Sequence, residues 1–174
     1  RRQGRAEAVA ATRGPGSHGG RRSGRQSSEV SWQKALDLFA ESLERRAAPD
    51  LAAYSRLIST CSRARQWERA LVLFADLQAG HLQPDEIAFS AAVSASEKGR
   101  QWKQALCFLV EMSERGITPG TFAYSAAIGS CRAEKLWDRA LLLLRDMLHL
   151  GVQPNAIVYN SAISVCERSG RWQC

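Results

Sequence analysis

The sequence predicts an all-α protein, an α-solenoid in which pairs of helices repeat every 35 residues. Every tryptophan lies 35 residues from the next one, and four of the five prolines follow the same interval. An alanine and a leucine stand three and four residues after each of the first four tryptophans. Such a fixed period is the mark of a repeat architecture. The recurring residues are Trp32, Trp67, Trp102, Trp137 and Trp172, with Pro49, Pro84, Pro119 and Pro154.

Residues 1–28 precede the repeats and contain few side chains that a core would bury. Seven arginines and one glutamate give this segment a net charge of +6, which leaves +1 of the total +7 for residues 29–174. The composition predicts a disordered segment. It fits an organelle transit peptide, a flexible linker or an arbitrary start within a longer chain. Because the repeats are nearly neutral, bulk charge does not by itself argue for a polyanionic partner.

Residues 29–50 are predicted to be a partial repeat with only its second helix. Apolar residues there recur at the spacing of one buried helix face, and the segment before them offers no first helix. These residues are Trp32, Ala35, Leu36, Phe39 and Leu43.

Three full units are predicted at residues 51–85, 86–120 and 121–155, followed by a truncated fourth at 156–174. In each full unit, the first helix carries apolar residues at unit positions 4, 7, 8 and 11, with Ser96 as the exception. The second helix begins at the tryptophan. Each unit closes with a glycine, Gly80, Gly116 or Gly151, that is expected to supply a left-handed residue, and then a proline. Because a solenoid needs polar capping elements and none is recognisable, we expect a fragment of a longer array with an exposed apolar C-terminal face.

No pattern in the chain indicates catalysis. Cys61, Cys131 and Cys166 fall at position 11 of first helices, which predicts core thiols in a reduced, intracellular protein rather than metal ligands. The tryptophans share the apolar stripe, so we expect them to pack in the core. No catalytic triad, carboxylate pair or phosphate-binding loop is present. We therefore expect no enzyme, cofactor, metal or small-molecule substrate, and no membrane span, since no apolar run reaches about 18 residues.

The units resemble those of the pentatricopeptide repeat family. The matching pieces are Tyr124-Ser125 and Tyr159-Asn160 in first helices, Trp137-Asp138-Arg139-Ala140-Leu141 opening a second helix, and Met147 with Gly151-Val152-Gln153-Pro154-Asn155 closing a unit. A tetratricopeptide repeat has a period of about 34 residues and a W-x2-L-G-x2-Y pattern in its first helix, which these units lack. Tryptophan at the start of the second helix departs from the aliphatic residue more usual in the family.

The resemblance implies a right-handed superhelix that binds single-stranded RNA, one base per repeat. It assigns base reading to unit positions 5 and 35, and base sandwiching to position 2. The pair Ser55 and Asp85 should prefer guanine, and Ser125 with Asn155 should prefer adenine. The second unit should tolerate any base because Gly120 has no side chain, and Asn160 suggests a pyrimidine. The base-reading residues are Ser55, Asp85, Ser90, Gly120, Ser125, Asn155 and Asn160, and the sandwiching residues are Ala52, Ile87, Phe122 and Ile157.

Physical reasoning supports these positions separately. Position 5 follows the buried aromatic residue at position 4, so its side chain points about 100° away from the core stripe. Aspartate only accepts hydrogen bonds, whereas asparagine also donates, so exchanging them at position 35 inverts the base edge that fits. The alternative is that these serine and asparagine residues cap helices.

Basic residues cluster at the turn between the two helices of each unit. They could follow a phosphate backbone, or they could simply favour helix C-termini, where the helix dipole attracts cations. The set is Arg63, Arg65, Lys98, Arg100, Arg132, Lys135, Arg168 and Arg171.

The function expected from these features is sequence-selective binding of single-stranded RNA, with other RNA-processing proteins as further partners. As in the family, the setting would be RNA processing, stabilisation, editing or translation in a chloroplast or mitochondrion. The alternative is a protein-interaction scaffold of the tetratricopeptide kind, which near-neutral repeats also suit. A salt titration separates the two, because binding to RNA weakens steeply with salt.

Overall fold

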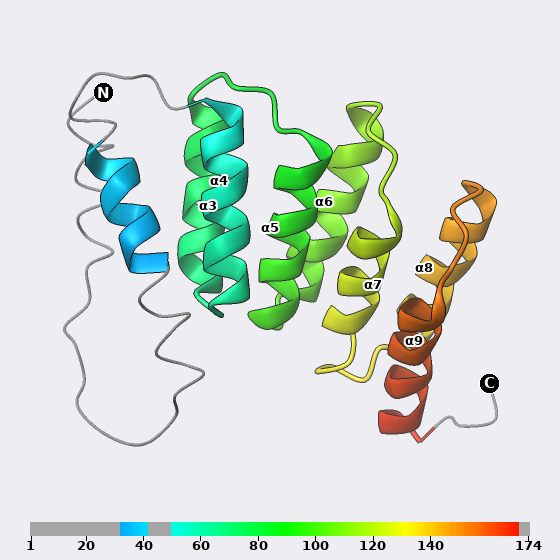
Figure 1. Cartoon of the computed structure of the whole chain (residues 1–174). Coiled ribbons are helices and arrows are strands. Elements are labelled where there is room, and N and C mark those ends of the chain that lie inside the picture. The colour runs from blue at the N-terminus through cyan, green and yellow to red at the C-terminus, as the bar shows by residue number, and fades with distance from the viewer. Residues whose placement is uncertain (1–31, 42–49, 171–174) are drawn as a thin grey trace, which may run out of the picture.

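The computed structural model describes residues 32–41 and 50–170, and its regular elements there are all helices. The first pair is α3 (Leu51–Arg63) and α4 (Trp67–Ala79), the second is α5 (Glu86–Lys98) and α6 (Trp102–Glu114), and the third is α7 (Thr121–Ser130) and α8 (Trp137–His149). Helix α9 (Ala156–Arg168) follows. The pairs stand side by side in chain order (Figure 1). The predicted all-α solenoid is confirmed, while residues 1–28, Arg171 and Trp172 lie outside the described part.

Aromatic contacts join the second helix of one pair to the first helix of the next. The rings of Phe74 and Phe89 meet with centroids 5.1 Å apart. The rings of Phe39 and Tyr54 meet in the same way at 4.8 Å. Residues 32–41 are helical. They therefore contact α3 through Phe39, while the rest of the predicted partial repeat, residues 29–31 and 42–49, lies outside the described part.

A basic residue in left-handed conformation lies in the turn after the first helix of each full pair. The φ angles are 61° at Arg65, 57° at Arg100 and 55° at Lys135. The amide of the next residue then bonds back to the helix, as from Gln101 N to the Ser96 carbonyl at 2.8 Å. This is the Schellman pattern, which glycine normally occupies because a side chain raises the energy of left-handed backbone.

The left-handed residues between pairs are His81, Gly116 and Gly151. The prediction that Gly80 serves in the first unit is wrong, because Gly80 has φ −78° and the following His81 has φ 60°. The helix thus ends one residue later than the glycine suggests, and the left-handed turn falls on a residue with a side chain.

The tryptophans contribute unequally to the core. Trp32 is buried, whereas Trp67 and Trp137 are half-buried and pack against the edge of the core. Trp102 is half-buried, with the Lys103 ammonium 5.6 Å from its ring centroid. The prediction of core packing is therefore met fully at Trp32 and partly at Trp67 and Trp137.

The predicted core thiols are buried at Cys61, Cys131 and Cys166. Burial raises the pKa of Cys61 to about 11 and also raises the pKa of Cys131. In the described part of the chain, no group of three histidine, cysteine or acidic side chains could hold a metal ion. None of the helices described there is both long and apolar enough to span a membrane.

Candidate nucleic-acid interface

The residue at position 35 caps the first helix of the next unit. Asp85 Oδ1 accepts a hydrogen bond of 2.8 Å from the amide of Ala88. Asn155 Oδ1 accepts bonds of 3.0 and 3.1 Å from the amides of Ile157 and Val158. Gly120 has no side chain to cap α7. Each cap uses one atom of the side-chain terminus, which leaves Oδ2 of Asp85 and Nδ2 of Asn155 outside the cap while the cap holds the side chain in place.

Positions 5 and 35 adjoin in the first unit, although they are 30 residues apart in sequence. The Ser55 hydroxyl donates to Asp85 Oδ1 at 3.1 Å. In the third unit Ser125 Oγ instead lies 3.4 Å from Ser161 Oγ of α9. Among the described residues, no hydrogen bond joins Ser125 to Asn155. In the part of the chain that the structure describes, the predicted pair is thus hydrogen-bonded in the first unit and not in the third.

Position 2 exposes a large apolar side chain in three successive units. Ile87, Phe122 and Ile157 are 63%, 63% and 64% exposed. Position 2 stands three residues before position 5, so the two share one helix face. We call the residues at positions 2, 5 and 35 the strip. Its members are Ala52, Ser55, Asp85, Ile87, Ser90, Gly120, Phe122, Ser125, Asn155, Ile157 and Asn160.

The basic residues lie at the opposite end of the same helices. Position 13 is 11 residues from position 2, which corresponds to ~16 Å along a helix. Lys98 is half-buried, its Nζ donates to Ser94 Oγ at 2.8 Å, and burial lowers its pKa. The other basic residues in the described part are exposed: Arg63, Arg65, Arg100, Arg132, Lys135 and Arg168. The strip and these cations thus form two separate lines across the first helices.

Glu86, at position 1 of the second unit, did not stand out in the sequence as a site residue. Its Oε1 lies 2.8 Å from where a Cβ of Gly120 would be. The signal that could have revealed it is that no other full unit has an acidic residue at position 1, where Leu51 and Thr121 stand.

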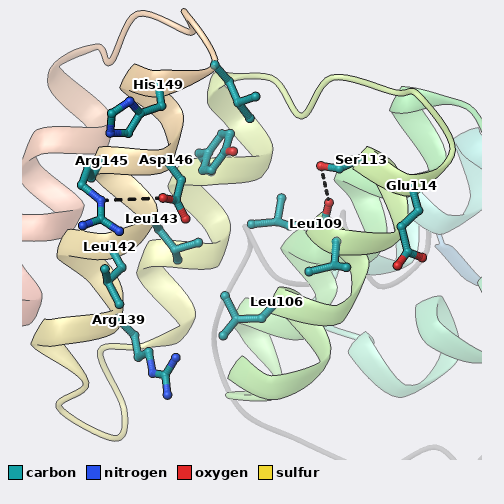
Figure 2. Close-up of a pocket in the computed structure, with 13 residues that line it drawn as sticks. Leu106, Leu109, Ser113, Glu114, Arg139, Leu142, Leu143, Arg145, Asp146 and His149 are labelled. Atoms are coloured by element: carbon teal, nitrogen blue, oxygen red, sulfur yellow. Dashed lines mark hydrogen bonds and ion pairs between the residues drawn. The ribbon is translucent and has the colours of Figure 1, made fainter.

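A separate groove of about 690 Å³ opens between α6 and α8 (Figure 2). Five leucines and several polar side chains line its walls, with Arg145 Nε and Asp146 Oδ1 3.9 Å apart on one side. No member of the strip lines it. The groove lies mainly between the second helices, with Tyr124 of α7 also in its lining, and is distinct from the candidate interface. Its leucines are Leu106, Leu109, Leu142, Leu143 and Leu150.

Comparisons with known proteins agree with this repeat organisation. The family model of the pentatricopeptide repeat domain matches residues 72–134, and that of the PPR repeat matches residues 52–79 and 122–152. No match was found among curated protein sequences.

Two solved structures illustrate the likeness. One is the pentatricopeptide repeat protein PPR10 from maize, solved in complex with an 18-nt psaJ RNA element. It is 27% identical with a TM-score of 0.68, over 99% of this chain and 26% of that chain. The PPR domain of Arabidopsis thaliana protein-only RNase P 1, in complex with tRNA, has 20% identity and a TM-score of 0.70, over 86% of this chain and 84% of that chain. The second likeness concerns the fold alone, and the chain spans about a quarter of the length of PPR10.

Proposed function

Because the chain belongs to the pentatricopeptide repeat family, we propose that it binds single-stranded RNA along the strip, with one base at each unit. The observation that carries the proposal is the row of exposed apolar side chains at Ile87, Phe122 and Ile157, in register with polar side chains at positions 5 and 35. Apolar and aromatic faces accept stacked bases without regard to sequence. The polar atoms beside them then select the base.

The chemistry of selection follows from the caps. With Oδ1 of Asp85 engaged at Ala88, its Oδ2 presents an acceptor, which suits the N1–H and N2–H donors of guanine. With Oδ1 of Asn155 engaged at α9, its Nδ2 presents a donor, which suits N1 of adenine. Asn160 is exposed on α9 and would extend the readout to a pyrimidine.

The role we propose is passive. An occupied strand is shielded from nucleases and held open for partner proteins, which fits RNA processing, stabilisation, editing or translation. The proposed setting is a chloroplast or mitochondrion, supported by family membership and the arginine-rich composition of residues 1–28. Fusing residues 1–31 to a fluorescent protein and locating it in cells tests the setting separately from RNA binding.

The test of RNA binding compares two exposed apolar side chains. Phe122→Ala should weaken binding of a single-stranded RNA about tenfold, because base stacking contributes ~1–3 kcal/mol per base and ~1.4 kcal/mol is a factor of ten. Val110→Ala is the matched control, because Val110 is 57% exposed on α6, away from the strip. Both variants keep residues 1–28, so any nonspecific attraction of RNA to that segment cancels when the two affinities are compared.

Two outcomes of this titration would contradict the proposal. One is equal loss of affinity in both variants, which would place RNA elsewhere on the molecule. The other is RNA affinity that hardly changes between low and moderate salt, since backbone contacts to RNA are salt-dependent. The second result would favour a protein-interaction scaffold.

A further inference from the structure

The second unit lacks a side chain at position 35, yet an acidic group occupies the space beside it. Gly120 caps α7 with backbone alone. A Cβ built on Gly120 would lie 2.8 Å from Oε1 of Glu86. The carboxylate of Glu86 therefore lies in the space that a side chain at position 120 would need.

We propose that Glu86 reads the base at the second unit in place of the missing side chain at Gly120. The inference rests on the proposed RNA binding along the strip and adds a specificity-determining residue to it. It replaces the expectation that this unit tolerates any base.

The pattern of the units suggests that an acid at position 1 takes over the role of the polar side chain at position 35. The first unit pairs Leu51 with Asp85, the second pairs Glu86 with Gly120, and the third pairs Thr121 with Asn155. The only full unit without a polar side chain at position 35 is thus the one with an acid at position 1.

The carboxylate of Glu86 is available to a ligand. Glu86 is exposed in the first turn of α5, and no described side chain forms a hydrogen bond or ion pair with it. Ser90 follows four residues later on the same helix, so both side chains face the same side. Its exposed neighbour Ile87 supplies the apolar surface at position 2.

The chemistry predicts guanine. A hydroxyl with a carboxylate is the combination found at Ser55 and Asp85, and the second unit repeats it with Ser90 and Glu86. A carboxylate only accepts hydrogen bonds, and guanine offers both N1–H and N2–H on its pairing edge, whereas adenine offers N6–H beside an acceptor.

The test uses short single-stranded RNAs in which guanine is fixed opposite the first unit and adenine opposite the third. The base between them is varied over all four bases, and each RNA is made in both strand directions. Dissociation constants of the full 174-residue chain are measured at low salt by NMR titration. The unaltered chain should prefer guanine over adenine at the middle base about tenfold. Glu86→Ala should abolish this preference, and Glu86→Ala with Gly120→Asp should restore it, because the new aspartate takes the place that Asp85 has in the first unit.

Thr121→Ala is the matched control, because it changes position 1 of the third unit and should leave the middle preference unchanged. If Glu86 served only to stabilise the start of α5 through the helix dipole, Glu86→Ala would lower stability without altering the middle-base ratio, which would overturn the inference.

The outcomes separate this inference from the proposed function. Equal binding of all four middle bases, with discrimination kept at the first and third units, overturns the role of Glu86 and leaves RNA binding standing. A guanine preference that survives Glu86→Ala also overturns it. Loss of discrimination at every unit of the unaltered chain contradicts the proposed function, and the inference fails with it.

Discussion

Individual side chains at position 35 serve two purposes through different atoms. Oδ1 of Asp85 and of Asn155 caps the following helix, while the second terminal atom of each side chain takes no part in the cap's hydrogen bonds. Helix capping and base reading are thus compatible at one residue, although the sequence presents them as alternatives. The cap also restricts the side chain's rotamers, so less conformational entropy is lost when a base binds.

Arg100 carries a long basic side chain on a left-handed backbone. Its φ of 57° is a conformation that glycine adopts more easily, and Gly99 stands immediately before it. We predict that Arg100→Gly leaves the free energy of unfolding unchanged or raises it by up to ~1 kcal/mol, because it relieves left-handed strain. The same change should weaken RNA binding and reduce the slope of log affinity against log salt by ~1 if the arginine contacts a phosphate.

The measurements for Arg100→Gly are denaturant unfolding followed by circular dichroism, and RNA titration at several salt concentrations. Arg63→Gly is the control, because Arg63 is an exposed helical residue in the last turn of α3. There glycine should lower stability by ~0.5–1 kcal/mol. Equal destabilisation by both variants would argue against strain at Arg100.

Contacts between helices explain why particular small residues stand where they do. A Cβ on Gly99 would lie 2.5 Å from Cδ2 of Trp67, so the end of α5 lies directly against the indole that begins α4. Since Gly99 has φ −81°, its glycine is required for this close approach and not for its backbone angle. Gly99 stands one residue before the left-handed Arg100, as Gly80 stands one residue before the left-handed His81.

Gly99→Ala should therefore destabilise the protein by ~1–3 kcal/mol, the usual range for overpacking. In a Trp67→Leu background, the added cost of the alanine should fall, because the smaller side chain leaves room for the methyl group. Denaturant unfolding of the two single variants and the double variant measures this coupling. Additive losses in the double variant would show that the indole is not what excludes a side chain at Gly99.

At the scale of the described molecule, the 35-residue period predicts the helix pairs, and neighbouring pairs pack through similar contacts, such as Phe39 with Tyr54 and Phe74 with Phe89. The residues of the strip were named from the sequence, but their neighbours in space were predicted only in part. Helix periodicity predicted that position 5 points away from the core stripe, yet Ser55 is buried, and position 2 was assigned by the family resemblance. The approach of Glu86 to Gly120 depends on the spacing between α5 and α7. The different partners of Ser55 and Ser125 likewise depend on how adjacent first helices lie, which no single unit encodes.

The number of units limits the affinity that the strip can provide. At ~1–3 kcal/mol of stacking per base, three units give about 6 kcal/mol before an association cost of ~4–15 kcal/mol. We therefore expect weak binding by the chain alone. A ratio of affinities for RNAs that differ by one base is then more informative than any single dissociation constant, because the costs common to both RNAs cancel.

The most direct measurement is the adenine-to-guanine affinity ratio at the base opposite the third unit, for the unaltered chain and for Asn155→Asp. Aspartate caps a helix as well as asparagine does, so the fold should be retained. We predict that the unaltered chain prefers adenine and that Asn155→Asp prefers guanine, because the donor at Nδ2 becomes an acceptor. An unchanged ratio in a folded variant that still binds RNA would contradict base reading at position 35.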